Sequence, residues 1–289
     1  MCSRRACKLI EIVMFIWAWT MTQNALAEDA PRAEESVPLR FHVVFNNVPY
    51  RADLQTAWGF ACLIEGPQRT VLFDTGGDGN ILLSNMQRLG LEPESVGTVV
   101  LSHIHTDHTG GLDAFLARNP TVSVYLPASF PAPLHHDIKR AGATVETVSG
   151  PRRLLDGVYS TGEMGDALQE QALVVDTANG LVVITGCAHP NVADMAERAH
   201  AYLGKDIYLL MGGFHLGGSS DAEVQEIIHR LRTLGVRKVA PSHCTGERAT
   251  EMFRDEWGSD FLEGGLGAVI EVPRSEPQEM RRKAKTGNG

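Results

Sequence analysis

The sequence predicts an α/β (α+β) fold in which two β-sheets pack together and carry helices on their outer faces. Apolar runs of strand length alternate with amphipathic segments of helical period. This alternation occurs in the first half of the chain and again, in similar style, in the second half. With 289 residues, of which 43% are hydrophobic, the chain can bury a sizeable core.

The first half is expected to be mainly strands. These strands cover 39–45, 59–65, 70–73, 98–101 and 122–126. One clear helix is expected over 80–89, because its apolar residues recur every three or four positions. A second, short helix is expected over 111–118.

The second half is expected to open with a β-hairpin, because two strand-like runs flank Asn179-Gly180, a strong turn signal. Helices and strands then alternate. The helices are expected over 192–202, 221–234 and 247–257, and the strands over 207–211, 236–240 and 267–272.

The first 27 residues are typical of a cleavable signal peptide. Basic residues precede an apolar stretch over 9–21, and Ala25-Leu26-Ala27 is a cleavage site. The apolar stretch falls short of the roughly 20 residues that a spanning helix needs. We therefore expect a periplasmic or secreted protein with no stable membrane anchor after cleavage. The expected divisions are a signal peptide over 1–27, a linker over 28–37, a catalytic domain over 38–273 and a flexible tail over 274–289.

Charge and cysteine content narrow the class of protein. The formal net charge of −9 argues against a nucleic-acid surface, which is normally basic. We expect a small-molecule substrate instead. Beyond the signal peptide the chain keeps Cys62, Cys187 and Cys244, an odd and widely spaced set that is not a disulfide framework.

The segment His103-Ile104-His105-Thr106-Asp107-His108 predicts a metal site, because it gathers three imidazoles and a carboxylate directly after an apolar run. Neutral imidazole suits Zn²⁺, and also Mn²⁺ or Fe²⁺, and the carboxylate adds a harder ligand. His103 and His105 can point the same way from an extended segment, whereas Asp107 and His108 can diverge toward a second ion.

Four other predicted strand ends carry polar residues in the same manner. They are Asp74-Thr75-Gly76-Gly77, Gly186-Cys187-Ala188-His189, Gly212-Gly213-Phe214-His215 and Ser242-His243-Cys244-Thr245-Gly246. Ligand sites of layered α/β proteins collect at such strand ends.

With these motifs, the chain resembles the metallo-β-lactamase superfamily over about residues 40–272. The likeness is strongest to its metal-dependent hydrolase branch, which is related to the archaeal 7,8-dihydropterin synthases of the methanopterin pathway. The resemblance implies a four-layer αβ/βα sandwich with a metal site at one edge.

The resemblance also implies a dinuclear site, with two Zn²⁺ ions as the expected cofactors. The expected ligands are His103, His105 and His189 for the first ion, and Asp107, His108 and His243 for the second. Most members place an aspartate between the metals after the strand that here ends in Gly212-Gly213. This chain has no aspartate there, and we expect His215 to replace it. Asp74 resembles the outer carboxylate that accepts a hydrogen bond from a ligand histidine or supports the motif loop.

The expected reaction is hydrolysis by a metal-bound hydroxide, because a metal lowers the pKa of its bound water to about 7. We expect Asp107 to act catalytically, by orienting the hydroxide or taking its proton. A neutral His215 in place of an anion would leave the metals more positive, which favours anionic, phosphorylated substrates.

Several residues have two interpretations. Tyr50 and Trp58 contact substrate or pack, and His135 and His136 form a wall of the site or a solvated loop. Cys187 and Cys244 are expected to be buried small residues rather than ligands.

Three other functions compete with hydrolysis. They are a transferase resembling the dihydropterin synthases, a non-catalytic metal- or ligand-binding module, and a true β-lactamase. The predicted export counts against a pterin pathway, the complete ligand set against a non-catalytic module, and the missing aspartate against a β-lactamase.

Overall fold

The computed structural model describes residues 38–66 and 70–273. The predicted signal peptide, linker and tail lie outside these residues. Among the helices of the described ranges, none combines the length and apolar character needed to cross a bilayer.

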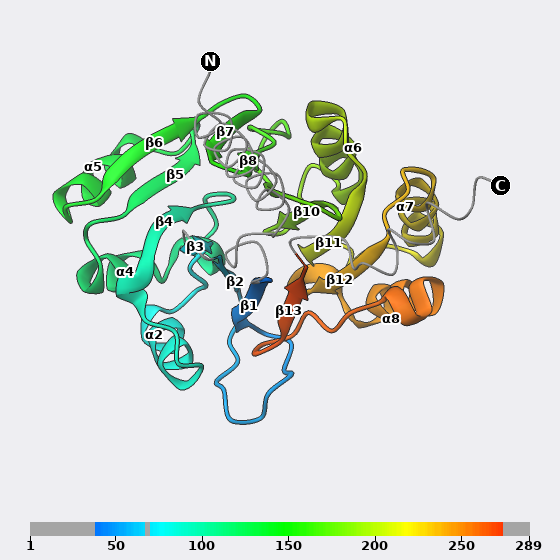
Figure 1. The fold of residues 1–289 in the computed structure, drawn as a ribbon, viewed down its shortest axis with the longest axis horizontal. Coiled ribbons are helices and arrows are strands. Elements are labelled where there is room, and N and C mark those ends of the chain that lie inside the picture. Colours follow the sequence, from blue (N-terminus) through cyan, green and yellow to red (C-terminus); the bar gives the residue numbers. More distant parts are fainter. Residues whose placement is uncertain (1–37, 67–69, 274–289) are drawn as a thin grey trace, which may run out of the picture. The chain divides into compact units, whose positions relative to one another are not determined.

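Two β-sheets organise the described residues (Figure 1). The first, seven-stranded sheet has the order β13 (Val269–Val272), β1 (Leu39–Asn46), β2 (Phe60–Glu65), β3 (Thr70–Phe73), β4 (Val96–Val100), β5 (Ser123–Pro127) and β6 (Thr144–Val148). The second, six-stranded sheet has the order β12 (Lys238–Ser242), β11 (Ile207–Gly213), β10 (Gly180–Thr185), β9 (Leu173–Thr177), β8 (Val158–Ser160) and β7 (Arg152–Leu155).

Helices cover the outer face of each sheet (Figure 1). Those on the first sheet are α2 (Gly79–Arg88), α4 (Leu112–Arg118) and α5 (Ala132–Arg140). Those on the second are α6 (Val192–Leu203), α7 (Asp221–Thr233) and α8 (Glu247–Trp257). Short helical turns are α3 (Thr106–Thr109), η2 (Pro93–Ser95), η3 (His243–Thr245) and η4 (Gly258–Asp260).

Side-chain alternation along the strands builds three apolar layers, because successive strand residues face opposite sides of a sheet. In β3, Leu72 packs under the helices of its own sheet, whereas Val71 and Phe73 face the second sheet. In β10, Val182 and Ile184 meet them from the other side. The sequence-based prediction of a four-layer αβ/βα sandwich is therefore confirmed.

Strand direction explains why the predicted motifs meet. β3 and β4 are parallel neighbours in the first sheet, and β10, β11 and β12 are parallel neighbours in the second. Parallel strands present their carboxyl ends at one edge, and the five motif-bearing loops leave from these five ends. The packing of the two sheets brings the two edges together.

The prediction of a Pro-rich loop around His135 and His136 was wrong, since both residues lie on α5. Proline is compatible with a helix in its first turn, where the missing N–H has no partner to lose. β6, β7 and β8 were not predicted, because exposed polar residues such as Arg152 and Arg153 hide their apolar period.

Truncating the layer between the sheets should unfold the protein more readily than truncating the surface. Phe41 in β1 is fully buried in that layer, so we expect Phe41→Ala to lower the free energy of unfolding by about 3–5 kcal/mol. Val269, 46% exposed on the edge strand β13, is the control, and Val269→Ala should cost less than about 0.5 kcal/mol. Urea unfolding of the full chain measures both, and equal losses would contradict the layer assignment.

Candidate metal centre

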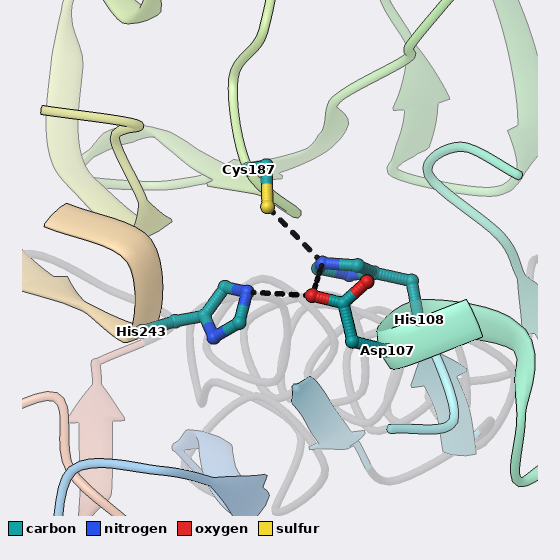
Figure 2. A group of neighbouring side chains, drawn as sticks. All are labelled: Asp107, His108, Cys187 and His243. Carbon is teal, nitrogen blue, oxygen red and sulfur yellow. Dashed lines mark hydrogen bonds and ion pairs between the residues drawn. The ribbon is translucent and has the colours of Figure 1, made fainter. Parts of the chain in front are cut away.

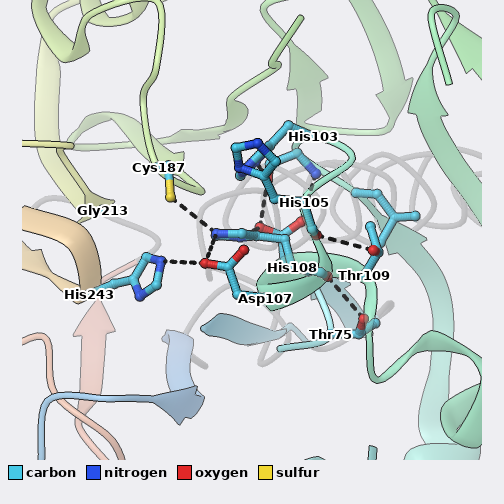
Figure 3. Close-up of polar contacts among 12 residues, drawn as sticks. Thr75, His103, His105, Asp107, His108, Thr109, Cys187, Gly213 and His243 are labelled. Carbon is cyan, nitrogen blue, oxygen red and sulfur yellow. Dashed lines mark hydrogen bonds and ion pairs between the residues drawn. The ribbon is translucent and has the colours of Figure 1, made fainter. Parts of the chain in front are cut away.

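The loops after β4, β10 and β12 bring nitrogen, oxygen and sulfur donors together in two adjacent groups (Figure 3). The first group consists of His103, His105 and His189, and the second of Asp107, His108, Cys187 and His243. Within each group the donor atoms all lie within 4.8 Å of one another. The rings of His103 and His108 join the groups, with centroids 4.2 Å apart.

In the first group, each of two rings has one nitrogen held from outside. His103 Nδ1 lies 2.8 Å from Ser102 Oγ, and His189 Nδ1 donates to Glu170 Oε2 at 2.8 Å. The other ring nitrogen, Nε2, of each of these histidines can therefore bind a cation. His103 Nε2 lies 3.2 Å from His105 Nδ1, the separation of two donors that face a common centre.

In the second group, whose four members Figure 2 shows, outer partners likewise hold two of the rings. His108 Nδ1 donates to Asp74 Oδ2 at 2.7 Å, and His243 Nδ1 donates to Asn47 Oδ1 at 2.7 Å. Their Nε2 atoms face Asp107 Oδ2 at 3.6 Å and 3.4 Å respectively. His108 Nε2 also lies 3.2 Å from Cys187 Sγ.

These contacts fit a bound cation. Outer partners on Nδ1 select the ring orientation of His108, His189 and His243 and leave Nε2 as the ligand atom. His243 Nε2 is buried and has no hydrogen-bond partner among the described residues, which is costly for a polar atom. A divalent cation between the donors would satisfy it.

Burial favours the neutral, metal-binding form of the rings. It lowers the pKa of His103 to about 3 and that of His108 to about 4, because a buried imidazolium loses its hydration. Burial alone would raise the pKa of Asp107, but the nearby imidazoles of His243 and His108 hold that pKa well below its usual range. Asp107 is therefore an ionised carboxylate at neutral pH.

Asp74 directly follows β3 of the first sheet and supports one histidine in each donor group. Its carboxylate accepts hydrogen bonds from the backbone N–H and the hydroxyl of Ser102, both at 2.7 Å, and from His108. Through Ser102 it also supports His103. Burial raises the pKa of Asp74 to about 7, so a nearby cation would favour its ionised form.

Glu170 plays the corresponding part in the second sheet, and sequence reasoning missed it. This fully buried carboxylate accepts the backbone N–H groups of Cys187, Ala188 and His189 at 2.8–2.9 Å, besides the His189 ring. Burial opposes its ionisation, but the hydrogen bond from His189 and the charge of His103 lower the pKa of Glu170 below its usual range. Glu170 belongs to no recognisable motif. The one available sequence signal was a charged residue just before a predicted apolar strand.

The backbone is strained where it delivers the site residues. Among the described non-glycine residues, positive φ angles occur at Asp74 (57°), Ala188 (64°), His215 (53°) and His243 (53°), and otherwise only at Asn191. Such conformations cost about 1–3 kcal/mol each and cluster at functional sites. The rest of the fold therefore offsets a local cost that turns these side chains inward.

His215 lies in a different environment from the one expected. Its donor atom groups with the sulfurs of Cys187 and Cys244, and its ring lies beside His189, with centroids 4.3 Å apart. A hydrogen bond with Cys244 raises the pKa of His215, and hydrogen bonds with Cys187 and His215 lower the pKa of Cys244. Sequence reasoning set both thiols aside, yet one adjoins the second histidine group.

Of the four expected substrate residues, Trp58 lies nearest the centre. It is 60% exposed, its ring centroid is 5.0 Å from that of His243, and both line a pocket of about 720 Å³. Tyr50 instead lines a separate surface groove with Tyr208. His135 and His136 lie on α5, outside the donor groups and this pocket.

Neutralising Glu170 should weaken both the fold and the site. We expect Glu170→Gln to lower the free energy of unfolding by about 3–5 kcal/mol, because the amide cannot accept all four donors. Zn²⁺ affinity should fall about 10–100-fold. Calorimetric titration and urea unfolding measure the two effects. Glu146→Gln, on an exposed position of β6, is the control, and unchanged zinc affinity in Glu170→Gln would refute the assigned role.

Comparison with known proteins agrees with this geometry. The model of the Metallo-beta-lactamase superfamily matches residues 59–243, from the residue before β2 to His243. A relative from Methanocaldococcus jannaschii, named 7,8-dihydropterin-6-methyl-4-(beta-D-ribofuranosyl)-aminobenzene-5'-phosphate synthase, is 28% identical over 270 residues. That match covers 76% of this chain and 92% of the relative.

Solved structures share the fold. A crystal structure described as a metal-dependent hydrolase of the beta-lactamase superfamily is 28% identical, with a TM-score of 0.71 over 81% of this chain and 99% of its own. A diphosphatase from the PhnP family has a TM-score of 0.57 at 14% identity, over 82% of this chain and 98% of its own. At that identity the diphosphatase shows likeness of fold alone.

Proposed function

The chain belongs to the metallo-beta-lactamase superfamily, and on that premise we propose that it is a metal-dependent hydrolase of a small molecule that holds two divalent cations side by side. The observation that carries the proposal is the pair of adjacent donor groups, in which outer partners hold the imidazoles with one nitrogen free. The ligands would be His103, His105 and His189 for one cation, and Asp107, His108 and His243 for the other. Zn²⁺ is the first choice, with Mn²⁺ or Fe²⁺ as alternatives.

A bound divalent cation supplies Lewis acidity and makes a coordinated water acidic enough to react near neutral pH. The chain's own part is to hold and orient. Asp107 stays ionised, and its low pKa makes it a weak base, so it orients groups by accepting hydrogen bonds rather than by taking a proton. Asp74 and Glu170 keep the imidazoles aimed at the site.

The pocket beside His243 suits the part of the substrate that does not react. Trp58, Val48 and Pro49 provide an apolar wall, and the acidic Glu247 and Glu251 lie among the residues that line the remainder. We propose that an apolar group binds against Trp58, while the two cations attract an anionic reacting end. Arg254 also lines this pocket but is paired with Glu263, so Glu247 and Glu251 disfavour a second anionic group there.

We further propose that the protein is exported to the periplasm or the medium, on the strength of the signal-peptide pattern over residues 1–27. A second candidate function is a transferase activity, which we consider because the Methanocaldococcus jannaschii relative is named a synthase. Export separates the two, because a pterin pathway belongs in the cytosol.

Metal removal tests the hydrolase proposal. Chelator-treated protein should lose at least about 100-fold in kcat/KM toward the best of a panel of phosphodiesters, phosphomonoesters, lactones and amides, and Zn²⁺ or Mn²⁺ should restore it. His103→Ala should lose activity to a similar extent. His229→Ala, on an exposed position of α7, should match the wild type.

Two results would contradict the proposal. Hydrolysis that survives chelation would exclude a metal-dependent reaction. Absence of turnover on the whole panel by metal-loaded protein, together with saturable quenching of a reduced pterin's fluorescence, would favour the transferase instead.

A further inference from the structure

The second donor group contains a sulfur that the superfamily resemblance does not supply. Members of the superfamily usually place an aspartate between the metals, after the strand that corresponds to β11, and here that strand ends in Gly212 and Gly213. We propose that Cys187, as a thiolate, is the fourth protein ligand of the second cation. This inference rests on the proposed function of the same site.

The distances suit a four-coordinate cation. Cys187 Sγ lies 3.2 Å from His108 Nε2, and Asp107 Oδ2 lies 3.6 Å and 3.4 Å from the Nε2 atoms of His108 and His243 (Figure 2). Tetrahedral zinc with ligand bonds of about 2.0–2.3 Å separates its donor atoms by about 3.3–3.8 Å. The four donors, all within 4.8 Å of one another, therefore need little movement to surround one ion.

The orientation of Cys187 is set by Glu170. Its backbone N–H donates to Glu170 Oε1 at 2.9 Å, and the next residue, Ala188, has a positive φ of 64°. The residue is 3% exposed, so its sulfur faces the centre rather than solvent. Glu170 thus holds Cys187 for the second cation and His189 for the first.

The end of β11 leaves no room for the usual carboxylate. A Cβ at Gly213 would lie 2.7 Å from Cys244 Sγ and 3.2 Å from Cys187 Cα, and it would collide with the carbonyl oxygen of Gly186. The Cys244 thiol and the backbone of Gly186 and Cys187 therefore occupy the space that a side chain from this strand end would need.

Cys244 does not share the position of Cys187. Its Sγ lies 3.5 Å from the carbonyl oxygen of Cys187 and groups with His215, outside the set that contains Asp107 and His108. His215 also lies outside that set and groups instead with Cys187 and Cys244. Cys187 is thus the proposed ligand, and the neighbouring thiol of Cys244 serves as a matched control.

Thiolate ligation changes which metal the second position prefers. Sulfur is a soft ligand that selects Zn²⁺ or Co²⁺ over Mn²⁺. Binding converts the thiol to a metal thiolate and releases its proton to solvent, with no change of oxidation state. We therefore expect the second position to discriminate against Mn²⁺ more strongly than the first.

Cobalt spectroscopy on the full chain tests the proposal without relying on activity. Metal-free protein is titrated with Co²⁺, and the near-ultraviolet sulfur-to-cobalt charge-transfer band is followed beside the visible d–d bands. We expect the charge-transfer band in the wild type and in Cys244→Ser, and its loss in Cys187→Ser. Affinity for the weaker-bound Co²⁺ should fall at least about 10-fold in Cys187→Ser alone.

Each other outcome is decisive. Two Co²⁺ ions bound by the wild type without a charge-transfer band would overturn the thiolate ligand and leave the dinuclear hydrolase intact. A band that persists in Cys187→Ser, or disappears only in Cys244→Ser, would assign the sulfur to another residue. Failure of the wild type to bind Co²⁺ would remove the proposed function as well. Matching circular dichroism of the variants guards against misfolding.

Discussion

The site depends on two buried carboxylates, Asp74 from the first sheet and Glu170 from the second. A buried carboxylate is tolerated only when its oxygens are fully hydrogen-bonded. Both meet this requirement with groups that belong to the site, and each supports one member of each donor group. Asp74 holds His108 directly and His103 through Ser102, while Glu170 holds His189 and the backbone of Cys187. The two donor groups are therefore positioned as one unit.

The packing of the rest of the fold offsets the free-energy cost of this unit. Parallel strand ends from both sheets deliver the loops to one edge, and three apolar layers provide the stability that offsets buried charge and strained backbone. Gly186 shows how close the approach is. A Cβ there would collide with Ser102 Oγ and lie 3.0 Å from Asp74 Oδ2, so only glycine lets the two sheets' loops meet.

Sequence alone predicted the elements whose period is clear, and it predicted the motif residues that the structure brings together. The helix over 247–257 matches α8, and the strand over 70–73 matches β3. It failed where side-chain chemistry gives no local signal. Glu170 and Asn47 lie outside the motifs, and their parts follow only from the packing of the two sheets. Cys187 lies within a motif, but only the structure shows its sulfur beside His108. The prediction of a loop at His135 was wrong because the nearby prolines were taken as evidence for a loop, whereas proline is compatible with the first turn of α5.

Anomalous diffraction at the zinc edge, on crystals of the zinc-loaded full chain, tests the central claim most directly. We predict two peaks, each about 2.0–2.3 Å from its ligands. The first peak should lie among His103, His105 and His189, and the second among Asp107, His108, Cys187 and His243. A single peak, or a peak held by His215 and Cys244 in place of Asp107 and His108, would contradict the account.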